Sequence, residues 1–243
     1  MRILIAGAGA TGGYFGGRLA EAGRDVRFLV RPGRAEQLRR DGLRIVSPHG
    51  DLTLTPKLLG ADAIDGPFDA VILAVKAYAL GAVLDALAPA IGPGTMIMPL
   101  LNGMRHVDRL IERFGERAVL GGVCIVATTL DAEGRIGQLA EMQELAYGER
   151  DGTTSDRVQA LDAALQGAGF RARLSEQILQ EMWEKWVMLS TAGGGTVNLL
   201  DRCWDRAQSG WRALGYAAAM TPVTSAQTWK AWVRAARYGT AGI

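Results

Sequence analysis

The segment RILIAGAGATG, residues 2–12, places a short apolar run directly before a turn that contains three glycines. Such a run predicts a buried strand, and the residues that follow, Tyr14–Ala22, are compatible with a helix that ends at Gly23. Asp25–Val30 then returns to the apolar pattern of a strand. The first thirty residues therefore predict a strand–helix–strand unit, the building block of a parallel sheet.

The same alternation continues along the chain. Apolar runs recur at Ala70–Val75, Met96–Leu101 and Val119–Ala127. Segments long enough for a helix lie between them, such as Leu80–Ala90 and Arg105–Phe114. Alternating strands and helices predict an α/β fold of Rossmann type, with a doubly wound, mainly parallel sheet that is covered by helices on both faces.

The pattern changes in the second half of the chain. Residues 136–148 set isolated apolar side chains among Gly and Gln, which is typical of a short hairpin or loose strands. Asp156–Gly167 predicts a helix, Phe170–Leu174 a short strand, and Ser175 the cap of a longer helical segment. We therefore expect a sheet-containing domain over residues 1–174 and a smaller, all-helical domain over residues 175–243.

The glycine-rich turn matches the pattern GxGxxG. The six residues of the match are Gly7, Ala8, Gly9, Ala10, Thr11 and Gly12. In this pattern the first glycine makes a tight turn, the second lets the backbone approach a diphosphate, and the third lets the helix pack closely. Because the turn follows a predicted strand and opens a predicted helix, whose free amides favour an anion, it predicts dinucleotide binding. A purely structural turn is the alternative.

The end of the second strand indicates which dinucleotide is bound. Sites for NAD usually have Asp or Glu at this point, to hold the ribose hydroxyls. This chain has Arg31, with Arg34 three residues later, and a guanidinium suits the 2′-phosphate of NADP. Residues 1–174 are therefore predicted to bind NADP. The alternative is that both arginines open a solvated helix after the turn at Pro32.

Two further polar residues follow predicted strands. Lys76 comes after the run at 71–75, and Asn102 comes after the run at 98–101. Because the carboxyl ends of parallel strands meet at one edge, where ligands bind in open α/β sheets, we expect both to line a crevice with Gly7 and Arg31. Lys76 as a solvated charge and Asn102 as part of a turn are the alternatives.

Lys185 has an apolar setting in a predicted helix. Ile178, Met182, Lys185 and Leu189 follow one helical stripe. Desolvation on such a surface favours the neutral amine, which helps a lysine to donate a proton near neutral pH. The alternative is a snorkelling lysine, whose stem covers the core while its ammonium reaches water.

Composition excludes several classes of function. The chain has 243 residues, 49% of them hydrophobic, with 27 Lys and Arg against 25 Asp and Glu, as expected for a soluble globular protein without a concentrated nucleic-acid-binding face. Two cysteines and two histidines without ligand spacing argue against a metal site and a disulfide framework. No apolar run is long enough for a signal peptide or a membrane span, so we expect a cytoplasmic protein without membrane contact.

Five motifs in order resemble the ketopantoate reductase (2-dehydropantoate 2-reductase) family over roughly residues 1–190. They are GAGATGG at the first turn, Arg31 at the strand end, AVKAY at 74–78, LLNGM at 100–104 and MWEKW at 182–186. The resemblance implies NADPH-dependent reduction of 2-dehydropantoate to pantoate, a step toward coenzyme A. It also implies that Lys185 is the general acid and that Lys76 and Asn102 contact cofactor and substrate.

The chain departs from the family pattern toward its C-terminus. The family commonly has asparagines one and two turns beyond the catalytic lysine, where this chain has Leu189 and Gly193. A late segment whose serine and acidic residue hold the substrate has no match. Residues 201–243 contain six Lys and Arg but two Asp, and four of the six tryptophans, as if the tail were truncated or read in another frame.

These departures keep other functions open. One is a catalytically impaired or silent NADP-binding protein of the same fold, and another is a reductase of a different branched 2-keto acid. The tail tryptophans are a candidate contact surface for a homodimer. Hydrolysis is the least favoured class, because the two histidines lack suitable partners.

Overall fold

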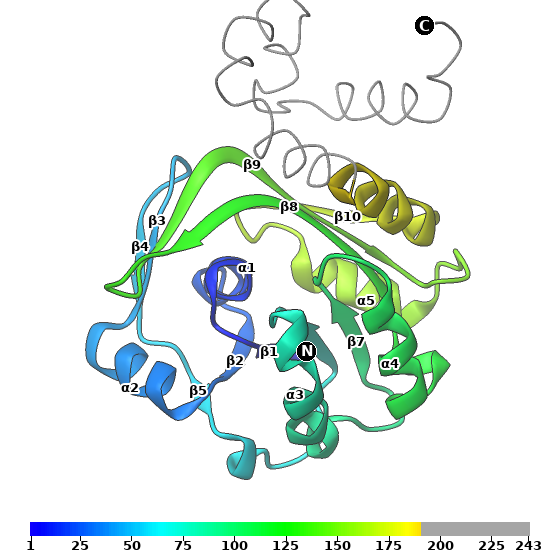
Figure 1. Ribbon diagram of the computed structural model, residues 1–243, viewed down its shortest axis with the longest axis horizontal. Coiled ribbons are helices and arrows are strands. Elements are labelled where there is room, and N and C mark those ends of the chain that lie inside the picture. The colour runs from blue at the N-terminus through cyan, green and yellow to red at the C-terminus, as the bar shows by residue number, and fades with distance from the viewer. Residues whose placement is uncertain (191–243) are drawn as a thin grey trace, which may run out of the picture. The chain divides into compact units, whose positions relative to one another are not determined.

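The structure is a computed structural model, and it describes residues 1–190 (Figure 1). Residues 1–182 form one compact unit and Trp183 begins a second, so each unit is described by itself. The predictions for Gly193 and for residues 201–243 lie outside the described residues, as does most of the predicted domain at 175–243.

The first unit contains a five-stranded sheet in which all paired strands run parallel. Its strands, in spatial order, are β5 (Leu58–Leu59), β2 (Asp25–Leu29), β1 (Arg2–Ala6), β6 (Ala70–Leu73) and β7 (Met96–Pro99). The helices beside them are α1 (Ala10–Glu21), α2 (Pro32–Asp41), α3 (Leu80–Leu87) and α4 (Arg105–Phe114) (Figure 1). The predicted Rossmann-type α/β fold is confirmed.

The two faces of this sheet are buried against different elements. Ile3 and Ile5 belong to a core cluster that includes residues of α1, whereas Leu4 and Ala6 belong to a cluster that includes residues of α3 and α4. Successive residues of a strand point to opposite faces. A strand that is covered on both faces therefore reads as a continuous apolar run, as β1 does.

The strand order reverses beside β1. The chain passes from β1 outward to β2 and β5, and then returns to β6 on the other side of β1. Such a reversal leaves a crevice at the carboxyl ends of the two strands that flank it, because their connections leave in opposite directions. The loops that follow β1 and β6 therefore leave the sheet at the position where ligands bind in open α/β folds.

A second sheet corrects two of the expectations. Its strands are β3 (Leu43–Val46), β4 (Leu52–Leu54), β8 (Gly121–Leu130), β9 (Ile136–Gly148) and β10 (Arg171–Leu174). The run at 119–127, expected in the parallel sheet, touches that sheet by a single bridge from Val119 to Ile97, and β8 pairs antiparallel with β9. The segment at 136–148, expected as a short hairpin or loose strands, is one long strand.

Close packing explains why both expectations differ from the structure. A Cβ at Gly122 would lie 2.5 Å from the carbonyl oxygen of Pro99, so β8 crosses directly over the end of β7 and then leaves the parallel sheet. Along β9, Ile136 is buried near α1, while Leu145 and Tyr147 are buried farther along the strand. Because the strand is covered by different elements along its length, its apolar residues show no regular alternation.

Helix α1 lies between the two sheets, and its glycines make that possible. A Cβ at Gly16 would lie 2.6 Å from the ring of Phe28 in the parallel sheet. On the other side, a Cβ at Gly17 would lie 2.8 Å from side-chain atoms of Ile45 and Leu43 in the second sheet. Glycines on both sides of α1 therefore let the helix approach two sheets at once, which explains the glycine run of the sequence.

The remaining elements agree with the sequence. Helix α5 (Asp156–Leu165) begins after Ser155, whose hydroxyl accepts a hydrogen bond from the Val158 amide at 3.3 Å. Residues 178–190 are helical, and the Ser175 hydroxyl accepts a hydrogen bond from the Gln177 amide just before them. In residues 1–190, no helix has the length and apolarity to cross a membrane.

Candidate functional site

The turn after β1 has a conformation that requires glycine at its first position. Gly7 has a φ of +102°, and a Cβ there would lie 3.0 Å from Val75 and 3.1 Å from the carbonyl oxygen of Ala74. The Gly7 amide donates to the Leu29 carbonyl oxygen at 3.1 Å, which ties the turn to β2. A side chain at this position would be strained and would collide with the loop after β6.

The other two glycines of the turn have opposite surroundings. A Cβ at Gly12 would lie 2.1 Å from the carbonyl oxygen of Gly7 and 2.8 Å from Ala74, so this glycine is needed for packing. At Gly9, which caps α1 with a φ of −84°, no atom lies within 4 Å of an added Cβ. The space beside Gly9 is therefore open, and the amides of Ala10 and Thr11 have no acceptor within the helix.

The two arginines at the end of β2 differ in their surroundings. The Arg34 Nε donates to the Ala8 carbonyl oxygen at 3.0 Å, and its terminal nitrogens donate to the Gly134 carbonyl oxygen at 3.2 Å. Burial lowers the pKa of Arg34, and the nearby Arg44 lowers it further. Arg31 lies at the start of α2 and is exposed. Arg34 is therefore used to support the glycine turn, and Arg31 is accessible to a ligand.

Lys76 and Asn102 follow adjacent strands at the same edge. Lys76 precedes a short 3-10 turn at Ala77–Ala79, and its side chain is exposed. Asn102 is also exposed, in a turn where Gly103 has a φ of +87°. The amide of Leu100 donates to the Leu73 carbonyl oxygen at 2.8 Å, which joins the starts of the two loops.

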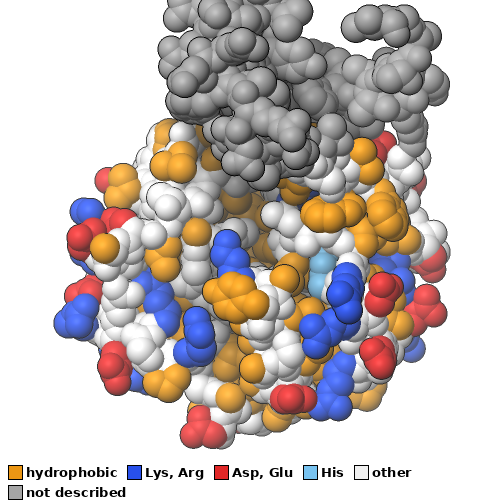
Figure 2. Space-filling model, viewed as in Figure 1, with side chains coloured by type: hydrophobic (Ala, Val, Ile, Leu, Met, Phe, Trp, Pro, Cys, Tyr) orange, Lys and Arg blue, Asp and Glu red, His pale blue; other side chains and the backbone are white. Residues whose placement is uncertain are grey.

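The sheet brings four of the predicted groups to one edge. Ala6 pairs with Leu29 and with Leu73, and Leu73 pairs with Pro99, so the four strands end at one level. The loops at 7–12, 30–34, 74–80 and 100–105 contain four Lys and Arg residues and no acid. This edge is therefore suited to a ligand with several negative charges. On the face shown in Figure 2, acidic side chains lie mostly along the outline and basic ones also occupy the middle.

Lys185 lies in the unit that begins at Trp183. It is half-buried in helix 178–190, while Ile178 and Met182 of the same predicted stripe are buried in the first unit. The segment that carries the predicted stripe is therefore helical, as expected. The role of Lys185 stays a prediction.

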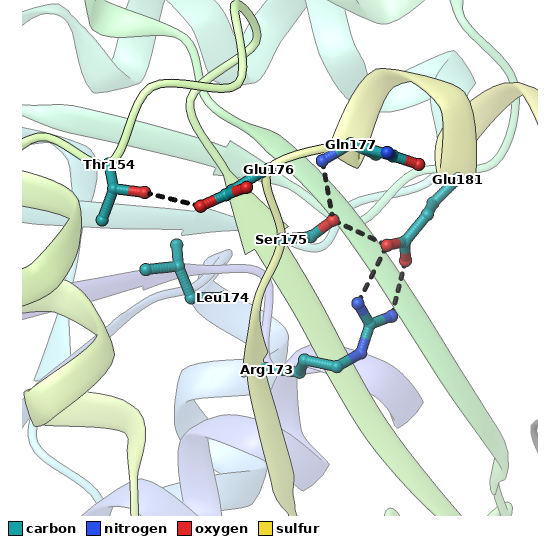
Figure 3. A pocket seen from close by; sticks show the side chains of 7 residues that line it. All are labelled: Thr154, Arg173, Leu174, Ser175, Glu176, Gln177 and Glu181. Carbon is teal, nitrogen blue, oxygen red and sulfur yellow. Dashed lines mark hydrogen bonds and ion pairs between the residues drawn. The ribbon is translucent and has the colours of Figure 1, made fainter.

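A shallow hollow of about 480 Å³ lies elsewhere on the first unit (Figure 3). It is lined by the end of β10, the turn before helix 178–190, Glu181 in the first turn of that helix, and Thr154, and it shares no residue with the four loops of the carboxyl edge. Within residues 1–190, no group of three or more His, Cys, Asp or Glu side chains is placed to hold a metal ion. The carboxyl edge of the parallel sheet is thus the candidate site.

Comparison with known proteins identifies the family. A sequence model described as "Ketopantoate reductase PanE/ApbA" matches residues 3–152, which include all four loops. The chain belongs to the ketopantoate reductase family. The uncharacterized oxidoreductase YkpB of Bacillus subtilis is 40% identical over 196 residues, which are 81% of this chain and 64% of that protein.

Solved structures show the same fold. A crystal structure of 2-dehydropantoate 2-reductase from Geobacter metallireducens has a TM-score of 0.71 and 31% identity over 78% of this chain and 62% of that one. A ternary structure of D-mandelate dehydrogenase with NADH and anilino(oxo)acetate has a TM-score of 0.70, covers 79% of this chain and 62% of that one, and at 22% identity shows the fold alone. The chain thus spans less than two thirds of the length of these relatives.

Proposed function

We propose that this protein is an NADPH-dependent oxidoreductase that reduces 2-dehydropantoate to pantoate. The observation that carries the proposal is the carboxyl edge of the parallel sheet, where the loops that contain the glycine turn, Arg31, Lys76 and Asn102 follow strands that end at one level. The family match over residues 3–152 supports the reaction class. The reaction would serve pantothenate and coenzyme A biosynthesis in the cytoplasm.

The residues present fit NADPH. Open space beside Gly9 leaves room for a diphosphate against the first amides of α1. A side chain at position 9 would occupy this space. Exposed Arg31 offers paired N–H donors to a 2′-phosphate, while Arg34 holds the turn in shape. An acid at position 31 would repel that phosphate, so the residue at this strand end favours NADP over NAD.

The chemistry then needs few groups from the chain. The bound nicotinamide supplies a hydride to the ketone carbon. Lys185 would hold a proton at its Nζ, donate it to the ketone oxygen, and stabilise negative charge there before the transfer. Lys76 would attract the carboxylate of the 2-keto acid, and Asn102 would donate a hydrogen bond to substrate or cofactor.

A silent NADP-binding protein is the second candidate. Leu189, where the family commonly has asparagine, favours it. Such a protein would retain the edge of the sheet and lack a complete substrate site.

Titration and assay of the same preparation distinguish the two. We would measure NADPH and NADH binding by fluorescence and follow cofactor oxidation with 2-dehydropantoate and other branched 2-keto acids. Turnover with NADPH and 2-dehydropantoate supports the proposal. Binding of NADPH without turnover of any keto acid supports the catalytically silent protein. Turnover only with a keto acid other than 2-dehydropantoate changes the assigned substrate. Tighter binding of NADH than of NADPH refutes the proposed role of Arg31.

A further inference from the structure

Three side chains tie helix 178–190 to the second sheet close to its first turn. Arg173 on β10 donates from its two terminal nitrogens to the two carboxylate oxygens of Glu181, at 2.8 and 2.5 Å. The Ser175 hydroxyl donates to the same carboxylate at 2.6 Å. Figure 3 shows the three side chains converging from the strand, the turn and the helix. We call Arg173, Ser175 and Glu181 the helix clamp.

The clamp is held firmly on its sheet side. The Arg173 Nε donates to the Glu144 carboxylate on β9 at 3.0 Å, so one guanidinium joins two strands and the helix. The hydrogen bond to Glu181 raises the pKa of Arg173, and burial opposes this effect. A Cβ at Gly148 would lie 2.1 Å from the Ser175 carbonyl oxygen, so the turn itself sits tightly against the end of β9. Glu181 therefore has little freedom to move along or around the helix axis.

Glu181 lies one helical turn before Lys185. In a helix, residues four apart lie on one side at a rise of about 1.5 Å per residue, so a rotation or shift at one is passed to the other. We infer that the helix clamp is a positioning device for Lys185, which sets the direction in which the ammonium leaves the helix. This inference rests on the proposed function, in which Lys185 is the proton donor. Arg173, Ser175 and Glu181 are thus positioning residues, and none of them belongs to the four loops of the carboxyl edge.

The chain contains a matched control. Arg157 donates to both carboxylate oxygens of Glu149, at 2.7 and 2.6 Å, and the Ser155 hydroxyl donates to the same carboxylate at 2.6 Å. This second group of serine, glutamate and arginine lies at the end of β9 and the start of α5, and its hydrogen bonds join these three side chains to one another. It has the same chemistry as the helix clamp, and none of its three residues belongs to helix 178–190.

The experiment compares Glu181→Gln with Glu149→Gln in the full chain. We expect both substitutions to lower the melting temperature, and both to leave the Kd for NADPH within about twofold of wild type. Only Glu181→Gln should lower kcat, by about tenfold to a hundredfold, because small displacements of a catalytic group are costly. Arg173→Gln removes the guanidinium contacts to Glu181 without changing the charge of the helix, and should repeat the loss of kcat.

A second measurement does not depend on turnover. The rate of acetylation of Lys185 by acetic anhydride, read by mass spectrometry of the folded protein, should change at least about threefold in Glu181→Gln and remain at the wild-type value in Glu149→Gln. Equal effects of the two substitutions on both kcat and labelling would overturn the inference. If wild type binds NADPH but reduces no keto acid, the proposed function fails, and the labelling of Lys185 alone then decides whether the clamp positions it.

Discussion

Replacing Gly9 with alanine is expected to weaken NADPH binding without lowering the stability of the fold, whereas the same change at Gly12 should destabilise the fold. The two residues belong to one turn and differ in what a methyl group would meet. A Cβ added at Gly9 would have no atom within 4 Å beyond its chain neighbours, whereas a Cβ added at Gly12 would lie 2.1 Å from the carbonyl oxygen of Gly7. The pair therefore separates ligand contact from packing within a single motif.

The magnitudes follow from these surroundings. Gly9 has a φ of −84°, which alanine adopts without strain, so the substitution should gain about 0.4–1 kcal/mol of stability through the unfolded chain. Alanine is a poorer N-cap than glycine by a similar amount, about 0.5–1 kcal/mol, so the free energy of unfolding should change little. Loss of one hydrogen bond to a charged diphosphate, worth about 1.5–3 kcal/mol, would raise the Kd for NADPH by about tenfold to a hundredfold. At Gly12 two backbone segments would have to separate, so the cost should lie near the upper end of the range for overpacking, about 3 kcal/mol.

Urea unfolding and fluorescence titration with NADPH measure the two effects. Gly94→Ala is the control, because Gly94 also has open space around it and precedes β7 at the opposite edge of the sheet. It should change neither the NADPH affinity nor the packing. Wild-type affinity in a folded Gly9→Ala variant would refute the placement of the diphosphate on this turn, and wild-type stability of Gly12→Ala would refute the packing argument.

Three further predictions test other residues. Arg31→Ala should reduce the preference for NADPH over NADH at least about tenfold and leave the stability unchanged. Arg34→Ala should lower the stability and weaken the binding of both NADPH and NADH. The melting temperature measures the first effect and titration with each cofactor the second. Lys185→Ala should lower kcat by about 10²–10⁴ with near-normal NADPH affinity, and equal losses of both would indicate a folding role. Burial raises the pKa of the Glu149 carboxyl, but Arg157 and Ser155 lower it by more, so the net pKa lies below its ordinary value of 4.5. The folded state thus binds this proton less readily than the unfolded state, and the stabilisation is complete above about pH 5 and lost as the pH falls through the lowered pKa. Arg157→Ala should therefore cost about 2 kcal/mol at pH 7 in urea unfolding and progressively less toward pH 3, and a cost independent of pH would contradict the assignment.

Much of the candidate site could be predicted because its signals are local. Each of the four loops directly follows a strand that the sequence identifies, and parallel strands necessarily present their carboxyl ends at one edge. The different surroundings of Arg31 and Arg34 could not be predicted. Arg34 is three residues from Arg31 in sequence, but its partner Gly134 comes from the β8–β9 connection, a hundred residues away.

The sequence by itself determined the parallel sheet, the glycine turn and the residues at its carboxyl edge, because strands, turns and helix starts depend on neighbouring residues. Only the tertiary structure decided that α1 lies between two sheets, that residues 136–148 form one long strand, and that Glu181 is tied to Arg173. These features depend on contacts between segments that are distant in the chain. The glycines of α1, for example, leave space beside the helix, and only the folded structure shows which segments fill it. Local patterns therefore predicted where a ligand would bind, and long-range packing determined how the elements around it are supported.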